Sequence, residues 1–220
     1  YYLCNMEKGN IANYAEMETF SNVFQYSYSV VDNVLLKMKG HWHEQFFKND
    51  NPVVLELELG CGKGEYVVCM ARMFPNINFI GVDVKGTRMW IGIKVAMEEE
   101  LPNVAFLRII FGIINRFFID GEVQEIWLRF SAQQLKNESK RLSFIYFMER
   151  YRKILVDGGL IHLKIDSISL FTYIKKMVKL NGLQVEMSTD DLYHADNIDE
   201  GTKSILYIRT YYESMWQERG

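Results

Sequence analysis

An apolar segment that runs directly into a glycine-rich turn constrains the fold of this chain more than any other feature. Residues 53–59 read Val-Val-Leu-Glu-Leu-Glu-Leu, and residues 60–64 read Gly-Cys-Gly-Lys-Gly. Apolar residues at helical spacing follow over residues 65–74, and Pro75 ends that segment. A buried strand, a tight glycine turn and a helix in this order are typical of α/β domains that bind nucleotides. The sequence therefore predicts a domain built around such a unit.

Strands and helices continue to alternate after this first unit. A second buried strand is predicted over Asn78–Asp83 and a helix over Thr87–Glu100. Further strands are predicted over residues 104–110, 125–130 and 160–165, and further helices over residues 142–155 and 170–180. Alternation of this kind predicts a doubly wound, parallel sheet. Residues 183–187 and 204–210 are strand-like without a clear helix between them, so we expect an antiparallel pair to close the sheet.

Length and composition indicate one globular domain. A chain of 220 residues can bury a substantial core but is short for two domains of ordinary size. The sequence is 49% hydrophobic and contains 3 prolines, which argues against a disordered chain. Residues 1–50 carry aromatic side chains without a clear period. We expect them to form an N-terminal arm that packs on a domain spanning residues 51–220.

Charge, cysteines and hydropathy limit the partners. The formal net charge of −3 gives no overall attraction to phosphate, so an RNA partner would need a local basic face. Cys4, Cys61 and Cys69 form no paired framework, which fits a reducing compartment. Because the sequence shows no membrane-length apolar run, we expect a cytoplasmic protein with no membrane partner. His41 and His43 have no further ligands nearby, so no metal is expected.

Two acidic residues at predicted strand ends indicate the cofactor. Asp83 ends the second strand 23 residues after Gly60, where a carboxylate can accept hydrogen bonds from both ribose hydroxyls. Glu58 lies just before the first glycine, where it would repel a pyrophosphate but attract the ammonium and sulfonium groups of S-adenosylmethionine. These residues favour S-adenosylmethionine over a dinucleotide. Glu56 lies on the same strand face as Glu58, and we expect it to be exposed near the sheet edge or strand end.

Several motif blocks resemble the tRNA (guanine-N7)-methyltransferase family. They are Leu57–Glu65, Asn78–Asp83, Asn103–Val104, His162–Asp166 and Thr210–Glu213, and their order and spacing match over about residues 40–220. The resemblance implies a Rossmann-like class I methyltransferase with a mostly parallel, seven-stranded sheet and an antiparallel C-terminal strand. It also implies transfer of a methyl group from S-adenosylmethionine to N7 of a guanine in the variable loop of tRNA.

The resemblance also implies roles for individual residues. The cofactor is expected to lie against Glu58, Gly60, Cys61, Gly62, Gly64, Asp83, Val84, Asn103, Val104 and Ile110. Asp166 is expected to be the catalytic residue that positions the guanine. Substrate contacts are expected from Lys136, Asp166, Thr210, Tyr211, Tyr212 and Glu213. The partner is tRNA, and the assembly is expected to be a monomer or a homodimer.

Three positions depart from the family pattern. Ile110 lies where the family usually carries an acid near the adenine of the cofactor, and Ala132 replaces the acid most closely linked to the reacting base. Ile165 lies where a threonine usually precedes Asp166. Guanine N7 carries no proton at neutral pH, so the reaction depends on alignment more than on a base. The sequence therefore leaves three alternatives: a slow tRNA methyltransferase, a non-catalytic tRNA-binding relative, or a small-molecule methyltransferase.

Clusters of basic residues are the candidates for phosphate contacts. On sequence alone, such clusters more often form solvated helix faces than RNA-binding surfaces. The resemblance shifts this balance towards RNA. The candidates are Lys136, Lys140, Arg141, Arg150, Arg152, Lys153, Lys175, Lys176 and Lys179.

Overall fold

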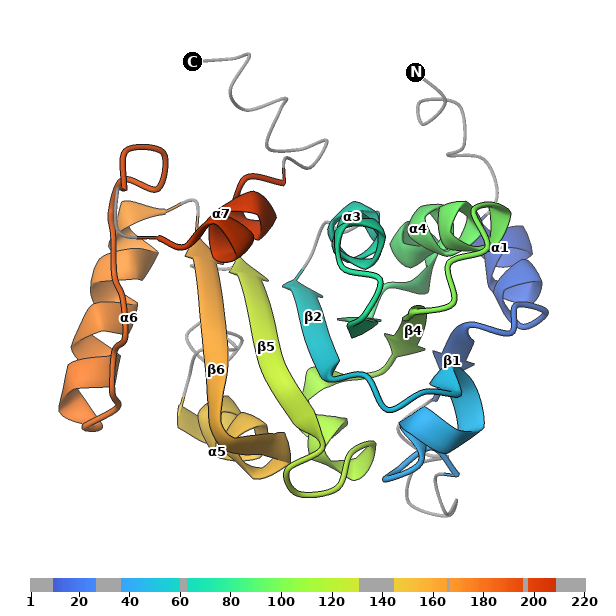
Figure 1. Cartoon of the computed structure of the whole chain (residues 1–220), viewed down its shortest axis with the longest axis horizontal. Helices are drawn as coiled ribbons and strands as arrows, with labels where there is room; N and C mark the ends of the chain where they lie inside the picture. Colours follow the sequence, from blue (N-terminus) through green and yellow to red (C-terminus); the bar gives the residue numbers. More distant parts are fainter. Residues whose placement is uncertain are drawn as a thin grey trace.

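One parallel sheet organises the described part of the computed structural model, which comprises residues 10–26, 37–59, 63–130, 145–165, 167–195 and 198–208. Its six strands pair in the order β1-β4-β3-β2-β5-β6 (Figure 1). The strands are β1 (Val23–Gln25), β2 (Val53–Leu59), β3 (Asn78–Asp83), β4 (Val104–Arg108), β5 (Val123–Phe130) and β6 (Leu155–Ile165). The doubly wound α/β architecture predicted from the sequence is therefore confirmed.

Helices cover both faces of this sheet. They are α1 (Asn10–Met17), the π-helix η1 (His43–Phe47), α3 (Glu65–Met73), α4 (Gly86–Glu98), the 3₁₀-helix η2 (Phe111–Arg116), α5 (Ile145–Ile154), α6 (Ile168–Leu180) and α7 (Glu200–Leu206). Helices α1, α3, α4 and α7 pack on one face, whereas η1, η2, α5 and α6 pack on the other. None of the helices in the described residues is both long and apolar enough to cross a membrane.

The order of the strands determines where a ligand can bind. The chain passes from β2 to β3 and β4 on one side, and then returns to place β5 against the other side of β2. This reversal makes the carboxyl ends of β2 and β5 a topological switch point, where ligands of open α/β sheets bind. The glycine turn begins directly after β2, so the sequence places it at this point.

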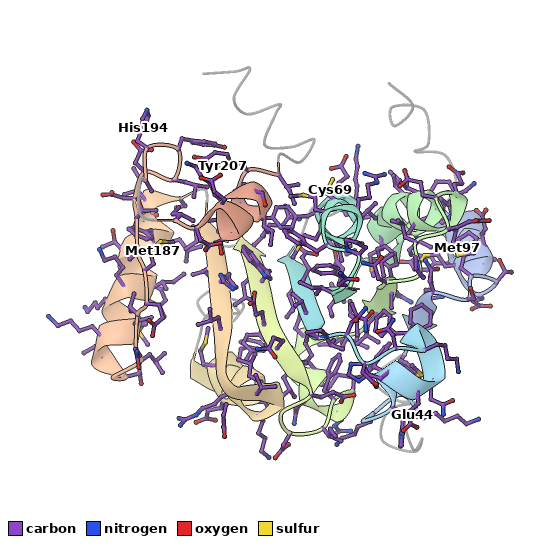
Figure 2. All side chains as sticks on the ribbon, viewed as in Figure 1. Glu44, Cys69, Met97, Met187, His194 and Tyr207 are labelled. Atoms are coloured by element: carbon purple, nitrogen blue, oxygen red, sulfur yellow. The ribbon has the colours of Figure 1, made fainter. Side chains whose placement is uncertain are left out.

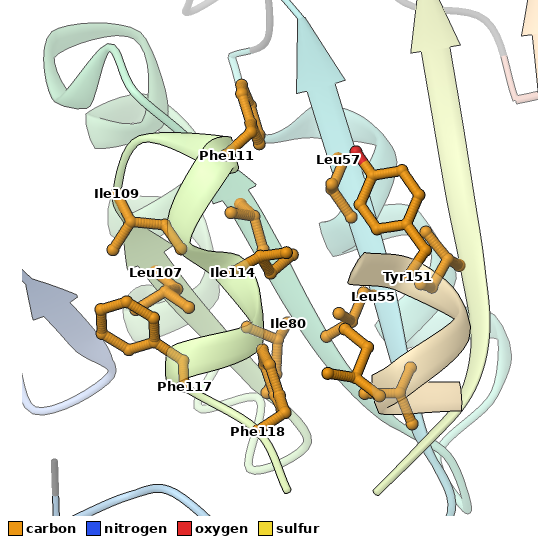
Figure 3. Close-up of a cluster of buried hydrophobic side chains, with 14 of the residues drawn as sticks. Leu55, Leu57, Ile80, Leu107, Ile109, Phe111, Ile114, Phe117, Phe118 and Tyr151 are labelled. Atoms are coloured by element: carbon orange, nitrogen blue, oxygen red, sulfur yellow. The ribbon is translucent and has the colours of Figure 1, made fainter. Parts of the chain in front are cut away.

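The core is buried on both sides of the central strands. All six residues of β3 are buried, as expected for a parallel strand that helices cover on both faces. Helix α5 and helix η2 fill one face with large apolar side chains (Figure 3). The labelled side chains of this cluster are Leu55, Leu57, Ile80, Leu107, Ile109, Phe111, Ile114, Phe117, Phe118 and Tyr151.

The described residues of the N-terminal arm are integrated into the sheet and its core. Strand β1 pairs with β4, with Val23 opposite Phe106, and so extends the sheet at one edge. Met17 and Trp42 are fully buried, and the indole Nε1 of Trp42 donates a hydrogen bond to the carbonyl of Phe117 at 3.0 Å. The sequence analysis identified neither α1 nor β1, because neither has a clear apolar period.

The two strand-like segments near the C-terminus are not strands in the described residues. Residues 183–187 form neither helix nor strand, and their large apolar side chains are 38–54% exposed. Residues 204–206 belong to α7, which begins where the carboxylate of Asp199 accepts a hydrogen bond from the backbone N–H of Thr202 at 2.9 Å. The prediction of strands over residues 183–187 and 204–206 is therefore wrong. The sheet of the described residues has six strands, and the seventh stays a prediction. Residues 209 and 210 lie outside the described part.

Candidate functional site

A small hollow lies beside the glycine turn at the carboxyl ends of β2 and β3. It is small, and part of it is open to solvent. It brings together Gly64 and Asp83, two of the predicted cofactor residues, although they belong to separate elements. The other lining residues are Glu56, Val67, Gly81, Val82, Met89 and Phe106. Two residues predicted for the cofactor therefore lie close together, and their role in binding stays a prediction.

The described end of the glycine turn is held by direct backbone packing against α4. Gly64 has a φ of 70°, in the left-handed region that favours glycine, and α3 begins directly after it. A Cβ atom on Gly92 of α4 would lie 2.7 Å from the Cα of Gly64 and 2.8 Å from the carbonyl oxygen of Lys63. The sequence analysis missed Gly92, although a glycine inside a predicted helix is a signal of close packing.

Asp83 is fixed at the end of β3. Its side chain is almost fully buried, with 2% of the residue exposed, and its Oδ1 accepts a hydrogen bond from the backbone N–H of Lys85 at 2.9 Å. The backbone carbonyl of Asp83 accepts a hydrogen bond from the N–H of Ile109 at 3.2 Å. A carboxylate held in this way at the wall of the hollow can accept hydrogen bonds from ribose hydroxyls.

Val84 and Ile110 lie at the same edge as Asp83. Val84 follows β3 and is 42% exposed, while Ile110 precedes η2 and is 49% exposed. Arg108 contacts this edge as well. Its guanidinium Nε lies 3.4 Å from the carbonyl of Val84, and the Cζ of the same guanidinium lies 4.6 Å from the ring centroid of Tyr14. The exposed apolar side chain of Ile110 is therefore at the edge where the family resemblance predicts an acid.

Asn103 and Val104 lie at the opposite edge of the sheet. Val104 lies opposite Phe79 at the start of β3. Arg108, which lies opposite Asp83 at the end of β3, is four residues later in the chain than Val104. At about 3.3 Å per residue, this separates Val104 from the carboxyl edge by about 13 Å. The Asn103 amide donates hydrogen bonds to the carbonyls at the junction of α3 and β3, namely those of Ala71, Phe74 and Ile77. These two residues stabilise the fold at a distance from the hollow, which corrects their assignment to the cofactor.

Glu56 is buried, and the expectation that it is exposed was wrong. It is 2% exposed because β2 is a central strand whose face is covered by α3. Its carboxylate forms an ion pair with the Nε of Arg129 on β5 at 3.0 Å, and the Arg129 guanidinium lies 4.1 Å from the ring centroid of Tyr66. Arg129 and Tyr66 were not predicted from the sequence. A charged residue in each of two adjacent apolar strands is the signal that could have identified the pair.

A second polar cluster lies between β5 and β6. The His162 ring stacks on Trp127 with 3.9 Å between ring centroids, and its Nε2 lies 2.9 Å from a carboxylate oxygen of Glu125. The hydrogen bond from His162 lowers the pKa of the Glu125 carboxyl, although partial burial opposes this shift. His162 belongs to one of the predicted motif blocks, and here it joins β6 to the amino-terminal and middle parts of β5.

Many of the predicted site residues lie outside the described part. Glu58 belongs to β2, where it is in register with Arg129. The predicted residues outside the described part are Gly60, Cys61, Gly62, Lys136, Asp166, Thr210, Tyr211, Tyr212 and Glu213, together with Ala132. The described cysteine is Cys69 on α3 (Figure 2), a free thiol whose pKa is raised by burial.

The histidines near the N-terminus have structural contacts. His41 pairs with Glu44 at 3.1 Å, and His43 Nε2 lies 2.8 Å from the carbonyl of Asn51. Across the described ranges, no three His, Cys, Asp or Glu side chains are grouped as a metal site would require.

The basic candidates for RNA contacts differ in their placement. Lys175, Lys176 and Lys179 lie on the exposed face of α6, whose first residue follows the carboxyl end of β6. Arg152 and Lys153 are exposed in the last turn of α5, directly before β6 begins, and so lie at the edge away from the hollow. The guanidinium Nε of Arg150 donates to the carbonyl of Gly112 at 2.9 Å. Because α6 begins at Ile168, its lysines are 7 to 11 residues further along the helix, so they too are displaced from the carboxyl edge.

Proteins similar in sequence to this chain include tRNA methyltransferases. A family model described as "Putative methyltransferase" matches residues 50–220. A tRNA (guanine-N(7)-)-methyltransferase of Bacteroides fragilis is 56% identical over 215 residues, which cover 98% of this chain and 83% of that protein. The enzyme of the same name from Porphyromonas gingivalis is 50% identical, over 93% of this chain and 82% of that protein.

Solved structures show a more distant similarity. The 16S rRNA methyltransferase KamB has a TM-score of 0.48 and 19% identity, with 72% of this chain and 71% of that chain covered. The aminoglycoside resistance methyltransferase NpmB1 has a TM-score of 0.46 and 15% identity, over 79% of this chain and 82% of that chain. The assignment to a family therefore rests on the relatives found by sequence.

Proposed function

The chain belongs to the tRNA (guanine-N(7)-)-methyltransferase family, and from this premise we propose that it transfers the methyl group of S-adenosylmethionine to N7 of a guanine in tRNA. The observation that carries this proposal is the 56% identity over 98% of the chain. The hollow between Gly64 and Asp83 supports it, because it lies where a class I methyltransferase needs its cofactor site. The resemblance in the motif blocks makes the variable loop the proposed target within tRNA.

The described residues fit S-adenosylmethionine. The glycine at position 64 lets the turn pack closely on α4, and the first turn of α3 offers N–H groups to a ligand. Asp83 is proposed to accept hydrogen bonds from the ribose hydroxyls, and Glu58 to face the ammonium group. Gly60, Cys61, Gly62, Val84 and Ile110 complete the proposed contacts. When bound, this cofactor supplies a methyl group on a positively charged sulfur.

The chemistry asks the protein mainly to align its substrates. A bond forms between guanine N7 and the methyl carbon, the carbon–sulfur bond breaks, and the positive charge passes from sulfur to the base. Asp166 and Glu213 are proposed to hold the guanine through its N1 and N2 donors and to offset this charge. Loss of one such group lowers a rate by on the order of 10²-fold. Because Ala132 and Ile110 replace two family acids, we propose that transfer is slow.

The substrate is proposed to be bound by Lys136, Thr210, Tyr211 and Tyr212 near the guanine, and by the lysines of α6 along the phosphate backbone. The assembly is proposed to be a monomer or a homodimer. No metal is needed for the transfer. Because tRNA is the substrate, we propose that the protein acts in the cytoplasm.

Labelled S-adenosylmethionine and an unmodified tRNA transcript test the activity. We expect label at N7 of one guanine in the variable loop, found by mapping the methylated base. We expect Ala132→Asp to raise the rate, because it restores the acid of the family pattern. Cofactor and tRNA binding with no transfer, even in this variant, would instead support the non-catalytic alternative that Ala132 and Ile110 favour.

The small-molecule alternative is decided by binding. Contacts with phosphate are strongest at low salt, so a tRNA methyltransferase must bind tRNA under that condition. If the protein bound S-adenosylmethionine but showed no affinity for tRNA at low salt, a small-molecule substrate would be favoured.

A further inference from the structure

A contact between the N-terminal arm and the carboxyl edge of β4 lies directly beside Asp83. Arg108 is the last residue of β4 and is opposite Asp83 in the register of β3 and β4. The Cζ of its guanidinium lies 4.6 Å from the ring centroid of Tyr14 on α1, within the range of a cation–π contact. Helix α1 lies beside α4 at this side of the sheet (Figure 1). We call the pair of Tyr14 and Arg108 the arm stack.

The loop of residues 84–86, between Asp83 and α4, packs closely against the arm stack. Gly86 is the first residue of α4, and a Cβ atom on it would lie 2.8 Å from the Cδ of Arg108 and 2.8 Å from the Cε1 of Tyr14. The absence of a side chain therefore lets the backbone approach both members of the stack. At the other end of the loop, the Nε of Arg108 lies 3.4 Å from the carbonyl of Val84. Both ends of the loop thus lie against the stack.

The middle of the same loop fixes the carboxylate that is proposed to bind the ribose. The backbone N–H of Lys85 donates a hydrogen bond to the Oδ1 of Asp83 at 2.9 Å. The backbone of Asp83 is held separately, because its carbonyl accepts a hydrogen bond from the N–H of Ile109 at 3.2 Å. A shift of the loop would therefore move the donor of the carboxylate without moving β3. Loss of the arm stack should change the orientation of the Asp83 side chain more than its position.

We propose that Tyr14 and Arg108 are positioning residues for S-adenosylmethionine, which hold the loop 84–86 so that Asp83 meets the ribose hydroxyls in a fixed orientation. This inference rests on the proposed function, since it takes Asp83 as a cofactor ligand. Tyr14 precedes residues 50–220, which the family model matches, so the arm gains a role in the cofactor site. The stack acts through the loop, and it therefore serves cofactor binding and not the transfer step.

The variant Tyr14→Leu tests this role, because it removes the ring and leaves the net charge unchanged. Cation–π contacts correspond to about 2- to 30-fold in an equilibrium constant, which limits how far their loss can lower the population of the binding-competent loop. We expect the Kd of S-adenosylmethionine in calorimetry, and the KM for it, to rise about 2- to 30-fold. At saturating cofactor, kcat should stay the same. The backbone amide of Lys85 should exchange faster with solvent, as measured by NMR.

Tyr14→Phe keeps the ring and should bind the cofactor like the wild type. Glu16→Leu is the matched control on the same helix. It breaks the contacts of Glu16 with the Trp90 Nε1 at 2.8 Å and with the Lys94 Nζ at 3.6 Å. These contacts lie four and eight residues beyond Gly86, or about 6 to 12 Å further along α4. We expect wild-type cofactor affinity and wild-type exchange at Lys85 in this control.

Arg108→Lys tests the stack from its other side. This variant keeps the positive charge but lacks the planar group that stacks on the ring, so the Kd of S-adenosylmethionine should rise in the same direction. If Tyr14→Leu does not fold, as judged by thermal unfolding, Arg108→Lys carries the test.

Two results would overturn the inference. Wild-type cofactor affinity in a folded Tyr14→Leu would show that the stack does not position Asp83. Equal losses of affinity in Tyr14→Leu and Glu16→Leu would show that docking of the whole arm matters, and not this contact. A wild-type protein that binds S-adenosylmethionine but methylates no tRNA would refute the proposed function alone, because the binding measurements need no tRNA. A wild-type protein that binds no S-adenosylmethionine would refute both.

Discussion

The two halves of the carboxyl edge are stabilised by different kinds of contact. On the half formed by β2, β3 and β4, the glycine turn packs backbone against backbone on α4, and a backbone N–H fixes the carboxylate of Asp83. On the half formed by β5 and β6, charged and aromatic side chains make the contacts. Arg129 of β5 pairs with Glu56 across the boundary to β2, and Tyr66 and Lys164 donate hydrogen bonds to carbonyls at the end of α7. Added atoms should therefore disrupt the first half, and changes of charge should disrupt the second.

The Glu56–Arg129 pair gives the largest expected effect. Arg129→Met removes the guanidinium that lies 3.0 Å from a carboxylate with 2% exposure. Breaking a buried pair from one side typically costs about 3 to 5 kcal/mol, because one charge stays buried without its partner. We expect a loss of this size in the free energy of unfolding, measured by urea denaturation. The double variant Glu56→Met, Arg129→Met should be closer to wild type, because both charges are removed.

An exposed ion pair of the same molecule is the control for this experiment. Arg72 and Glu99 join α3 to the end of α4, with side chains that are 40% and 42% exposed. Because water solvates both groups, Arg72→Met should cost less than about 1 kcal/mol. Equal losses in Arg72→Met and Arg129→Met would contradict a special role for charge in the half formed by β5 and β6.

A single added methyl group should disrupt the other half. Alanine is favoured over glycine inside a helix by about 1 kcal/mol, so Gly92→Ala would stabilise an isolated α4. In the protein, however, the new Cβ would lie 2.7 Å from the Cα of Gly64. We expect a net loss of about 1 to 3 kcal/mol in unfolding free energy, together with weaker binding of S-adenosylmethionine in calorimetry.

Gly112→Ala is the control for the added methyl group. No atom lies within 4 Å of a Cβ placed on Gly112 of η2, so that variant should keep both the stability and the cofactor affinity of the wild type. Wild-type cofactor affinity in Gly92→Ala would show that the contact between the turn and α4 does not support the cofactor site.

The sequence predicted the first half of the edge better than the second, and the reason is the range of the interactions. Strand β3 has the predicted bounds Asn78–Asp83, because six consecutive buried residues are a local pattern. Gly64 and Asp83 were likewise predicted from residues adjacent to their own strands. The burial of Glu56 was not predicted, because it depends on Arg129, which is 73 residues later in the chain. A pairing between distant residues leaves no periodicity in the sequence.

The errors near the C-terminus and at Asn103 have different causes. Residues 204–210 alternate like a strand, but the cap formed by Asp199 starts a helix that this short pattern cannot reveal. Asn103 belongs to a motif block of the family, and it was assigned to the cofactor because a motif does not distinguish folding from binding. Its three hydrogen bonds show that this position serves the junction of α3 and β3.

The smallest expected effect comes from two carboxylates near the amino end of β5, whose pKa values shift in opposite directions. The hydrogen bond from His162 lowers the pKa of Glu125 below its ordinary value of 4.5. Burial raises the pKa of Glu122, although the N–H groups of Ile119 and Gly40 donate to it. A lowered pKa adds stability that is present above pH 4.5 and is lost as the pH falls through the folded value. A raised pKa has the opposite effect on stability, which is lost as the pH rises and regained as the pH falls.

Unfolding free energies measured between about pH 3 and 7 check this contrast. The stability advantage of the wild type over Glu125→Gln should shrink as the pH falls below 4.5. Relative to Glu122→Gln, the wild type should instead gain stability as the pH falls. Since the Glu125 side chain is 33% exposed, water weakens its pair with His162, and the change should be less than about 1 kcal/mol. If the stability difference changed with pH in the same direction for both variants, the two carboxylates would not differ in environment. A charge-assisted hydrogen bond lowers the pKa of one carboxyl, whereas burial raises the pKa of the other.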